Sequence, residues 1–274
     1  MPRGTQPTKD KFHRLRVSKS ADRGTIRPAP SADQVSIYGI HAVEAVLFNP
    51  QRDVRRLFIT KNAERRLATA LSERALAIER ILPKDLDRRL GRETVHQGAL
   101  AECTHLPDVP LDALVKETRA TSRPVVVLDQ VTDPQNVGAV LRSASAFGAA
   151  GLVMTRRHSP PLAGALAKAA SGALERVSVC LVQNLARALA TMSSDGISVW
   201  GLEGGGPTRF ESIIGSRPAA LVLGAEGKGL RQSTRAACDQ VCHLATDGSA
   251  SSLNVSNAAA VALYAHLITR TNAA

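Results

Sequence analysis

The sequence predicts an α/β protein with a mostly parallel C-terminal sheet and a small N-terminal α/β domain. Three observations support this fold class. From residue 123 onward, short apolar runs alternate with helical patterns, as in a parallel sheet covered by helices on both faces. The stretch 35–105 carries a shorter α/β pattern of its own. Between them, 106–122 contains two prolines and is typical of a linker with one weak helix.

The composition restricts the partner and the compartment. The 274-residue chain has a formal net charge of +11, which favours a polyanionic partner because clustered cations displace counterions from phosphates. Only 3% of the residues are aromatic, so we do not expect large stacking platforms for single-stranded nucleic acid. No apolar run is long enough to span a bilayer, and the basic N-terminus lacks an apolar signal core. We therefore expect a cytoplasmic protein that does not bind a membrane.

The four cysteines stand at irregular spacing, which fits a reducing cytosol better than a disulfide framework. Cys238 and Cys242 would lie one helical turn apart if this stretch were helical, and would then form half of a metal site. No second pair of ligands lies nearby in the sequence. The simpler interpretation is that both are buried small hydrophobic residues, and we expect no metal.

The N-terminal part begins with a basic arm. Residues 1–34 are rich in Arg, Lys, Pro and Ser and lack apolar periodicity, so we expect disorder there. Either a solvated tail or an arm that binds RNA phosphates is consistent with this pattern.

The α/β unit at 35–105 is too short for a cofactor-binding sheet, so we expect it to recognise the substrate. We expect His41, within this unit, to be a packed structural histidine. Its elements are a strand and helix around Gly39, a strand at 54–60, a helix containing Leu67, Leu71 and Leu76, and a strand near 98–102.

The C-terminal domain, 123–274, alternates regularly. The expected strands cover 124–129, 151–155, 177–182, 197–201, 219–224 and 241–245, and the expected helices cover 135–147, 160–172, 184–193, 229–238 and 254–270. The first helix has clear ends, because Asp133 can cap it, Pro134 suits its first turn and Gly148 can end it. Asn136 and Arg142 project from this helix. They follow a buried strand, at the edge where open α/β sheets bind ligands.

The glycine-rich segments do not match nucleotide motifs. No G-x-G-x-x-G sequence follows the first strand, and the segment 201–206 leads into a proline, which favours a flexible loop. In 224–230 the lysine precedes a glycine, so this is not a phosphate-binding Walker loop. The sequence therefore does not indicate ATP or NAD.

Two further polar residues occur at the ends of buried segments. Glu226 follows the 219–224 strand among glycines that allow a ligand to approach the backbone, although it could instead cap the next helix. Asn254, with Ser252, precedes a helix rich in small residues and could bind a ligand or cap that helix. Small residues suit either a dimer interface or tight internal packing.

Together these loops resemble the SpoU branch of the SPOUT RNA ribose 2′-O-methyltransferases. The resemblance covers about 123–270 and rests on three motifs in order, with a further match at 168–175. The segment 38–43 and the unit after it resemble the N-terminal substrate-binding domain of members that methylate a 23S rRNA guanosine. The three motifs are Asp133-Pro-Gln-Asn136-Val-Gly138-Ala-Val-Leu-Arg142, Leu223-Gly224-Ala-Glu226-Gly-Lys-Gly229-Leu, and Ser252-Leu253-Asn254-Val255-Ser256.

The resemblance implies a trefoil-knotted C-terminal sheet, S-adenosylmethionine as cofactor and a homodimer that completes the site. By match, Gly224, Leu244 and Leu253 would contact the cofactor. This chain departs from the family at Leu244-Ala245-Thr246, where members usually have Ile-Pro-Met, so the shape of the cofactor rim is expected to differ.

The resemblance also implies catalytic residues, namely Arg142, Asn136, Glu226 and Asn254. Arg142 would lie beside the reacting ribose oxygen. A guanidinium stays protonated in proteins, so we expect it to stabilise the developing alkoxide instead of acting as a base. Glu226 could orient Arg142 as a bidentate partner. The implied function is 2′-O-methylation of a guanosine in 23S rRNA. A tRNA ribose methyltransferase and a catalytically silent RNA-binding ribosome-assembly factor are the alternatives.

Overall fold

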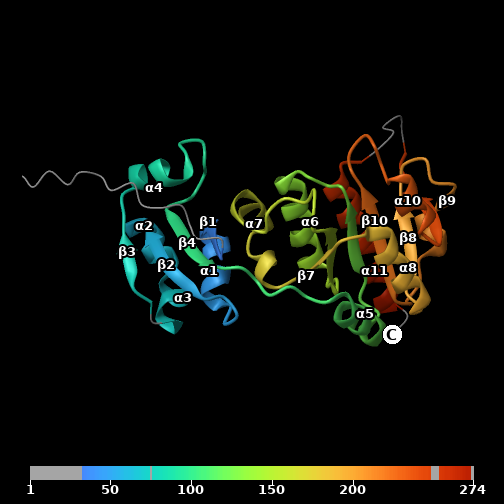
Figure 1. The fold of residues 1–274 in the computed structure, drawn as a ribbon, viewed down its shortest axis with the longest axis horizontal. Helices are drawn as coiled ribbons and strands as arrows, with labels where there is room; N and C mark the ends of the chain where they lie inside the picture. Colours follow the sequence, from blue (N-terminus) through green and yellow to red (C-terminus); the bar gives the residue numbers. More distant parts are fainter. Residues whose placement is uncertain (1–32, 75, 248–252, 273–274) are drawn as a thin grey trace, which may run out of the picture.

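The protein contains two sheets side by side, a four-stranded sheet in the N-terminal part and a seven-stranded sheet in the C-terminal part (Figure 1). The computed structural model describes residues 33–74, 76–247 and 253–272. Nearly all of the expected basic arm and Ser252 of the third motif therefore lie outside the described residues. No helix in the described ranges is both long and apolar enough to cross a membrane.

The N-terminal sheet has the order β1-β4-β2-β3, antiparallel except for the β2–β3 pair. The expected helix through Leu67, Leu71 and Leu76 is wrong in detail, because the helical stretch is divided at Leu67 and ends before Leu76. A further helix that the sequence analysis missed begins at Pro83, whose fixed φ suits a first helical turn. The elements are β1 (Gln34–Tyr38), α1 (Ile40–Phe48), β2 (Val54–Ile59), α2 (Lys61–Arg66), α3 (Ala68–Glu73), β3 (Ile78–Arg80), α4 (Pro83–Leu90) and β4 (Ala99–Thr104).

The C-terminal sheet is parallel throughout, with the order β7-β6-β5-β10-β8-β11-β9. The alternation expected from the sequence is confirmed, with most ends within two residues. Its strands are β5 (Val125–Asp129), β6 (Gly151–Thr155), β7 (Ser178–Val182), β8 (Ser198–Leu202), β9 (Thr208–Arg209), β10 (Ala219–Gly224) and β11 (Gln240–His243). Its helices are α5 (Leu111–Thr121), α6 (Pro134–Ala146), α7 (Gly164–Ala170), η1 (Ala173–Glu175), α8 (Leu185–Ser194), α9 (Phe210–Ile213), α10 (Gln232–Ala236) and α11 (Val255–Asn272).

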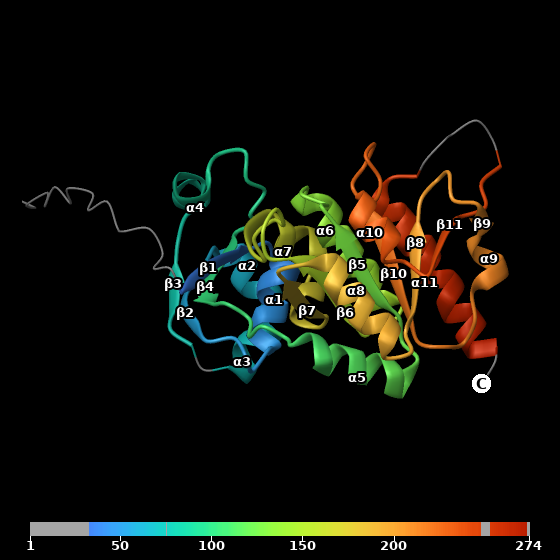
Figure 2. The ribbon, with the colours of Figure 1, turned by 45° about the vertical axis from the view of Figure 1, so that its right-hand side comes forward.

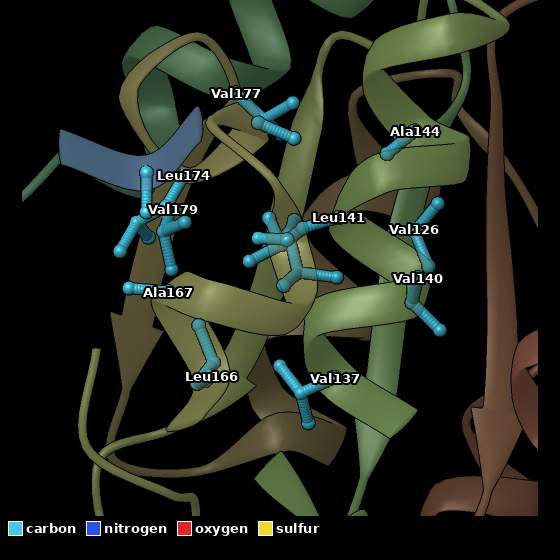
Figure 3. Packing of buried hydrophobic residues seen from close by; sticks show 14 of the residues in the cluster. Val126, Val137, Val140, Leu141, Ala144, Leu166, Ala167, Leu174, Val177 and Val179 are labelled. Carbon is cyan, nitrogen blue, oxygen red and sulfur yellow. The ribbon is translucent and has the colours of Figure 1, made fainter. Parts of the chain in front are cut away.

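Helices cover both faces of this sheet, as its continuous apolar strands predict. Alternate residues of β5 point to opposite faces, so that Val126 packs with α6, α7 and α11 and Val127 with α5 and α8. Figure 3 shows the first of these faces, where Val137 and Leu141 of α6 lie close to Leu166 of α7. The expected linker helix is thus the regular helix α5, which packs on the C-terminal sheet.

A glycine explains the close contact between α6 and α7. A Cβ at position 138 would lie 2.5 Å from the Cβ of Ala169 and 2.7 Å from the carbonyl oxygen of Leu166. Gly138 therefore allows the two helices to pack backbone against backbone. Both ends of α6 agree with the sequence analysis. At the start, Asp133 accepts a hydrogen bond from the Gln135 amide at 2.9 Å, and after the last turn Gly148 has a φ of +70°.

The two sheets are joined by a shared core and a buried ion pair. One apolar cluster runs from α1 into α7 and η1, and the views in Figures 1 and 2 both place these elements between the sheets. At its edge, Arg52 pairs with Glu175 at 2.8 Å, with side chains that are 1% and 3% exposed. Asn49 also donates to Glu175, at 2.7 Å. The N-terminal domain is thus packed on the C-terminal domain, in addition to being connected to it along the chain.

Candidate active site

The order of strands places a binding edge between β5 and β10. Strands β6 and β7 follow one another on one side of β5. The chain then crosses to the other side for β8, and β10 lies between β5 and β8. Ligands of open α/β sheets bind outside the carboxyl ends of the strands at such a reversal. A cavity of about 600 Å³ lies at this edge, a size typical of small-molecule sites. It is lined by the ends of β8 and β10, the turn 225–229, Leu244, Thr246 and the start of α11.

All three residues expected to contact the cofactor line this cavity. Gly224 ends β10, Leu244 follows β11 and Leu253 precedes α11, so segments far apart in sequence converge here. Thr246 also lines the cavity, so the segment that departs from the family motif does border the expected cofactor site. Position 224 requires a glycine for a steric reason, because a Cβ there would lie 2.2 Å from the carbonyl carbon of Gly229.

Three of the four expected catalytic residues form one hydrogen-bonded cluster at the mouth of the cavity. The amide of Asn136, on the first turn of α6, donates to Oε1 of Glu226 at 3.0 Å. The amide of Asn254 donates to the same carboxylate oxygen and, at 3.1 Å, to Oδ1 of Asn136. Glu226 and Asn254 line the cavity, and both are exposed. We call these three residues the polar cluster.

The capping interpretations are resolved by these contacts. Glu226 lies in the turn well before α10 and accepts from the two asparagines, so its interpretation as a helix cap is wrong. Asn254 caps the helix that follows it, as one of the two interpretations expected, whereas its contact with a ligand stays a prediction. Its Oδ1 accepts from the Ser256 amide at 2.9 Å and caps α11, while its amide group joins the polar cluster.

Arg142 lies apart from the polar cluster within this chain. It is six residues beyond Asn136 on α6, about 9 Å further along the helix axis at 1.5 Å per residue. Its side chain is exposed, does not line the cavity, and makes no hydrogen bond or ion pair with a described residue. The bidentate Arg142–Glu226 pair expected from the sequence is therefore not formed within the chain.

Glu203 is a residue that the sequence analysis missed. The segment 201–206 is only partly a loop, because Gly201 and Leu202 belong to β8 and residues 203–205 line the cavity. Oε1 of Glu203 accepts a hydrogen bond from the Leu230 amide at 3.0 Å, just after the turn that carries Glu226. A lone carboxylate among glycines gives no periodic signal in the sequence, so the contact becomes visible only in three dimensions.

The structure corrects the expectation for His41 and decides between the two interpretations of Cys238 and Cys242. His41 is exposed at 60% of its side chain, so the packed histidine interpretation is wrong. Cys242 lies on β11 and Cys238 lies beyond the end of α10, so they are not on consecutive turns of a helix. Burial raises the pKa of both thiols to about 12, as expected for inert, neutral cysteines. Within the described ranges, no group of three His, Cys, Asp or Glu side chains could hold a metal ion.

The fold and the cavity define an α/β protein that binds a small molecule at the carboxyl edge of a parallel sheet. Comparison with known families makes this specific. The chain belongs to the SpoU rRNA methylase family, whose model matches residues 123–264. A second family model, RNA 2′-O ribose methyltransferase substrate binding, matches residues 36–109.

Curated relatives extend over most of the chain. A Pseudomonas putida protein named 23S rRNA (guanosine-2′-O-)-methyltransferase RlmB is 37% identical over 238 residues, covering 83% of this chain and 94% of that protein. The Coxiella burnetii protein of the same name is 33% identical over 233 residues, covering 84% and 93%. The match to nearly the whole length of these relatives includes both sheets.

Solved structures share the fold. The SpoU methyltransferase AviRb of Streptomyces viridochromogenes, solved with its cofactor AdoMet, superposes with a TM-score of 0.74 at 23% identity, covering 88% of this chain and 92% of that one. A TrmH-family protein of Porphyromonas gingivalis gives a TM-score of 0.69 at 25% identity, covering 85% and 89%. The expected fold class, a mostly parallel α/β sheet with a small N-terminal domain, is confirmed. The trefoil knot stays a prediction.

Proposed function

We propose that this chain transfers a methyl group from S-adenosylmethionine to the ribose 2′-hydroxyl of a guanosine in 23S rRNA. The observation that carries the proposal is the convergence of Gly224, Leu244 and Leu253 on one cavity, with the polar cluster at its mouth. The family and the length of the match to the named relatives support the same reaction. An rRNA substrate also implies a cytoplasmic site of action.

The cavity suits S-adenosylmethionine. It has about 600 Å³, with apolar walls from Leu202, Leu223 and Leu253 beside exposed glycine backbone at 204 and 205. Apolar walls with a few placed polar groups are typical of cofactor sites. When bound, S-adenosylmethionine supplies a methyl group activated by its sulfonium. The residues proposed to hold it are Gly224, Leu244 and Leu253, through backbone groups and apolar contact.

The chain's own contribution to the reaction is to position the acceptor oxygen and stabilise its charge. An in-line displacement gains most from holding the reacting atoms at near-attack distance. We assign this task to Asn136, Glu226 and Asn254, whose mutual hydrogen bonds fix the first turn of α6, the turn after β10 and the start of α11 relative to one another. Arg142 would stabilise the developing alkoxide and the neighbouring phosphate. Because its guanidinium stays protonated, water or a phosphate oxygen would take the proton.

A homodimer would bring Arg142 to a cavity that it does not line within its own chain. Val261, Tyr264 and Ile268 are spaced three and four residues apart on α11 and are 46%, 53% and 40% exposed. An apolar stripe of this kind is typical of a protein interface. The stripe adjoins α6, since α11 packs against that helix. The ring centroids of Tyr264 and of Phe147, the residue that follows α6, lie 5.7 Å apart. We propose that this face pairs with a second copy and that Arg142 acts in the cavity of the partner.

The test of the reaction uses purified protein with labelled S-adenosylmethionine. Unmodified 23S rRNA and bulk tRNA are supplied separately, and the 2′-O-methyl position is mapped in the product. We expect label in 23S rRNA and binding of S-adenosylhomocysteine by calorimetry. Label in tRNA alone would move the proposal to a tRNA ribose methyltransferase. Absence of both methyl transfer and S-adenosylhomocysteine binding would favour a silent RNA-binding assembly factor.

The test of Arg142 uses mixed dimers. Arg142→Ala should abolish transfer while S-adenosylhomocysteine binding stays close to wild type, because the side chain lies outside the cavity. Gly224→Val should block the cavity itself. If Arg142 acts across the interface, a mixed dimer of the two variants contains one intact site and regains activity. If Arg142 acts within its own chain, the mixture stays inactive. Substantial activity of Arg142→Ala alone would remove this residue from the mechanism.

A further inference from the structure

The turn that carries Glu226 folds back tightly onto the end of its own strand. The Gly229 amide donates to the carbonyl of Ala225 at 2.9 Å, and Gly229 has a φ of +64°. A Cβ at Gly224 would lie 2.2 Å from the carbonyl carbon of Gly229, so the two backbones are in direct contact. Every residue from 225 to 229 lines the cavity. The position of this turn therefore decides both the shape of the cavity and the position of Glu226.

Two carboxylates hold the chain where it leaves this turn. Oε1 of Glu203 accepts from the Leu230 amide at 3.0 Å, and Oδ2 of Asp129 accepts from the Arg231 amide at 2.9 Å. Glu203 follows β8 and Asp129 ends β5, and these strands are the two neighbours of β10 in the sheet. Two consecutive amides are thus held from opposite sides of the strand that precedes the turn.

Both carboxylates are themselves fixed. The second oxygen of Asp129 accepts from Nε of Arg231 at 2.7 Å, and Asp129 is fully buried. The second oxygen of Glu203 pairs with Arg235 on α10, and only 15% of the Glu203 side chain is exposed. The Glu203 amide also donates to the Cys242 carbonyl at 2.9 Å, which anchors its backbone to β11. Charge-assisted hydrogen bonds shielded from water hold geometry better than neutral, exposed ones.

We propose that Glu203 is a positioning residue of the cofactor site, with Asp129 as its counterpart on the other side of β10. Glu203 is the one of the pair that lines the cavity, and its Oε1 would lie 3.0 Å from a Cβ at Gly229. Glu203 fixes the position of the turn, and the turn keeps Glu226 within hydrogen-bonding distance of Asn136 and Asn254. This inference rests on the proposed function, because it assigns Glu203 to the site where S-adenosylmethionine would bind.

The experiment compares Glu203→Ala with Glu203→Gln. The glutamine side chain keeps an acceptor oxygen for the Leu230 amide and loses only the charge opposite Arg235. For Glu203→Ala we expect the KM for S-adenosylmethionine and the Kd for S-adenosylhomocysteine to rise by about tenfold or more, the usual effect of losing a hydrogen bond to a charged group. For Glu203→Gln we expect recovery of most of this loss. Asp195→Ala, an exposed change at the end of α8, serves as the matched control.

Hydrogen exchange at the Leu230 amide gives a second measurement that needs no cofactor. Glu203→Ala should accelerate exchange of this amide, and Glu203→Gln should keep it protected. If the wild type does not bind S-adenosylhomocysteine, the proposed function fails, while exchange still tests whether Glu203 holds the turn. Wild-type binding and wild-type exchange in Glu203→Ala would overturn the inference. If the alanine variant does not fold, the inference is overturned by a glutamine variant that binds weakly despite a protected Leu230 amide.

Discussion

Removing Glu175 should destabilise the N-terminal domain and its packing on the C-terminal domain by about 3–5 kcal/mol, the usual cost of leaving one charge of a buried ion pair without its partner. Arg52 and Glu175 are 1% and 3% exposed, so water cannot replace the lost partner. Nε and Nη2 of Arg52 donate to the carboxylate at 2.9 and 2.8 Å, and Asn49 adds a third donor. A cost of this size is a large part of the 5–15 kcal/mol that typically separates folded from unfolded domains.

The assay is denaturant unfolding of Glu175→Leu, followed by two signals. Trp200 is the single tryptophan and lies on β8, so its fluorescence reports the C-terminal sheet, while circular dichroism reports both domains. For the wild type we expect coincident transitions, because the two domains share a core. For Glu175→Leu we expect the circular dichroism transition to begin at lower denaturant than the Trp200 transition, since Arg52 is then buried alone in the N-terminal domain.

The double variant Arg52→Met with Glu175→Leu separates charge from packing. Replacing both members of a buried pair by apolar residues is often close to neutral, so it should recover much of the stability lost in the single variant. Glu64→Gln is the control, because Glu64 forms a bidentate pair with Arg80 at the surface and should change stability little. A change below about 1 kcal/mol for Glu175→Leu, or coincident transitions in that variant, would refute this reasoning.

Two other predictions follow from single positions. Gly224→Ala should lower the melting temperature and weaken S-adenosylhomocysteine binding measured by calorimetry, because the new Cβ would overlap the Gly229 backbone. Gly205→Ala is the control in the same cavity. Its Cβ would meet no atom within 4 Å, so this change should be tolerated. Burial lowers the pKa of His266, so below its ordinary pKa of about 6.5 the unfolded chain binds a proton that the folded chain does not. The free energy of unfolding should therefore fall as the pH drops from 7 to 5. Unfolding curves of His266→Leu should show a weaker dependence of this free energy on pH.

The sequence predicts the C-terminal elements well because each gives a local signal. Strand β10 is a continuous apolar run, and α6 has a capping aspartate, a proline in its first turn and apolar residues at helical spacing. The residues of the polar cluster could also be predicted from the sequence, since Asn136, Glu226 and Asn254 each follow or begin such an element. The N-terminal domain is less clear because its signals are short. Strand β3 has three residues, and only Leu86 of α4 is buried.

Contacts between distant segments could not be predicted in this way. Arg52 and Glu175 are 123 residues apart, and Glu203 and Leu230 are 27 apart with two strands, β9 and β10, between them. Each of these charged residues is typical of an exposed surface when only its neighbours in sequence are considered. Their roles depend on which strands become neighbours, and the insertion of β10 between β5 and β8 has no local signal. The same limit explains why the sequence suggested a direct Arg142–Glu226 pair.

The packing of the two domains bears on how a target nucleotide would be selected. A domain on a flexible linker delivers its RNA over a range of distances set by the length of that linker. Here α1 packs against α7 and η1, and α7 packs closely on α6, the helix that carries Asn136. RNA held by the substrate-binding domain would therefore stand at a fixed distance from the polar cluster. The Glu175→Leu variant should then lose selectivity among nucleotides before it loses the ability to transfer a methyl group, because the cavity itself contains neither Arg52 nor Glu175.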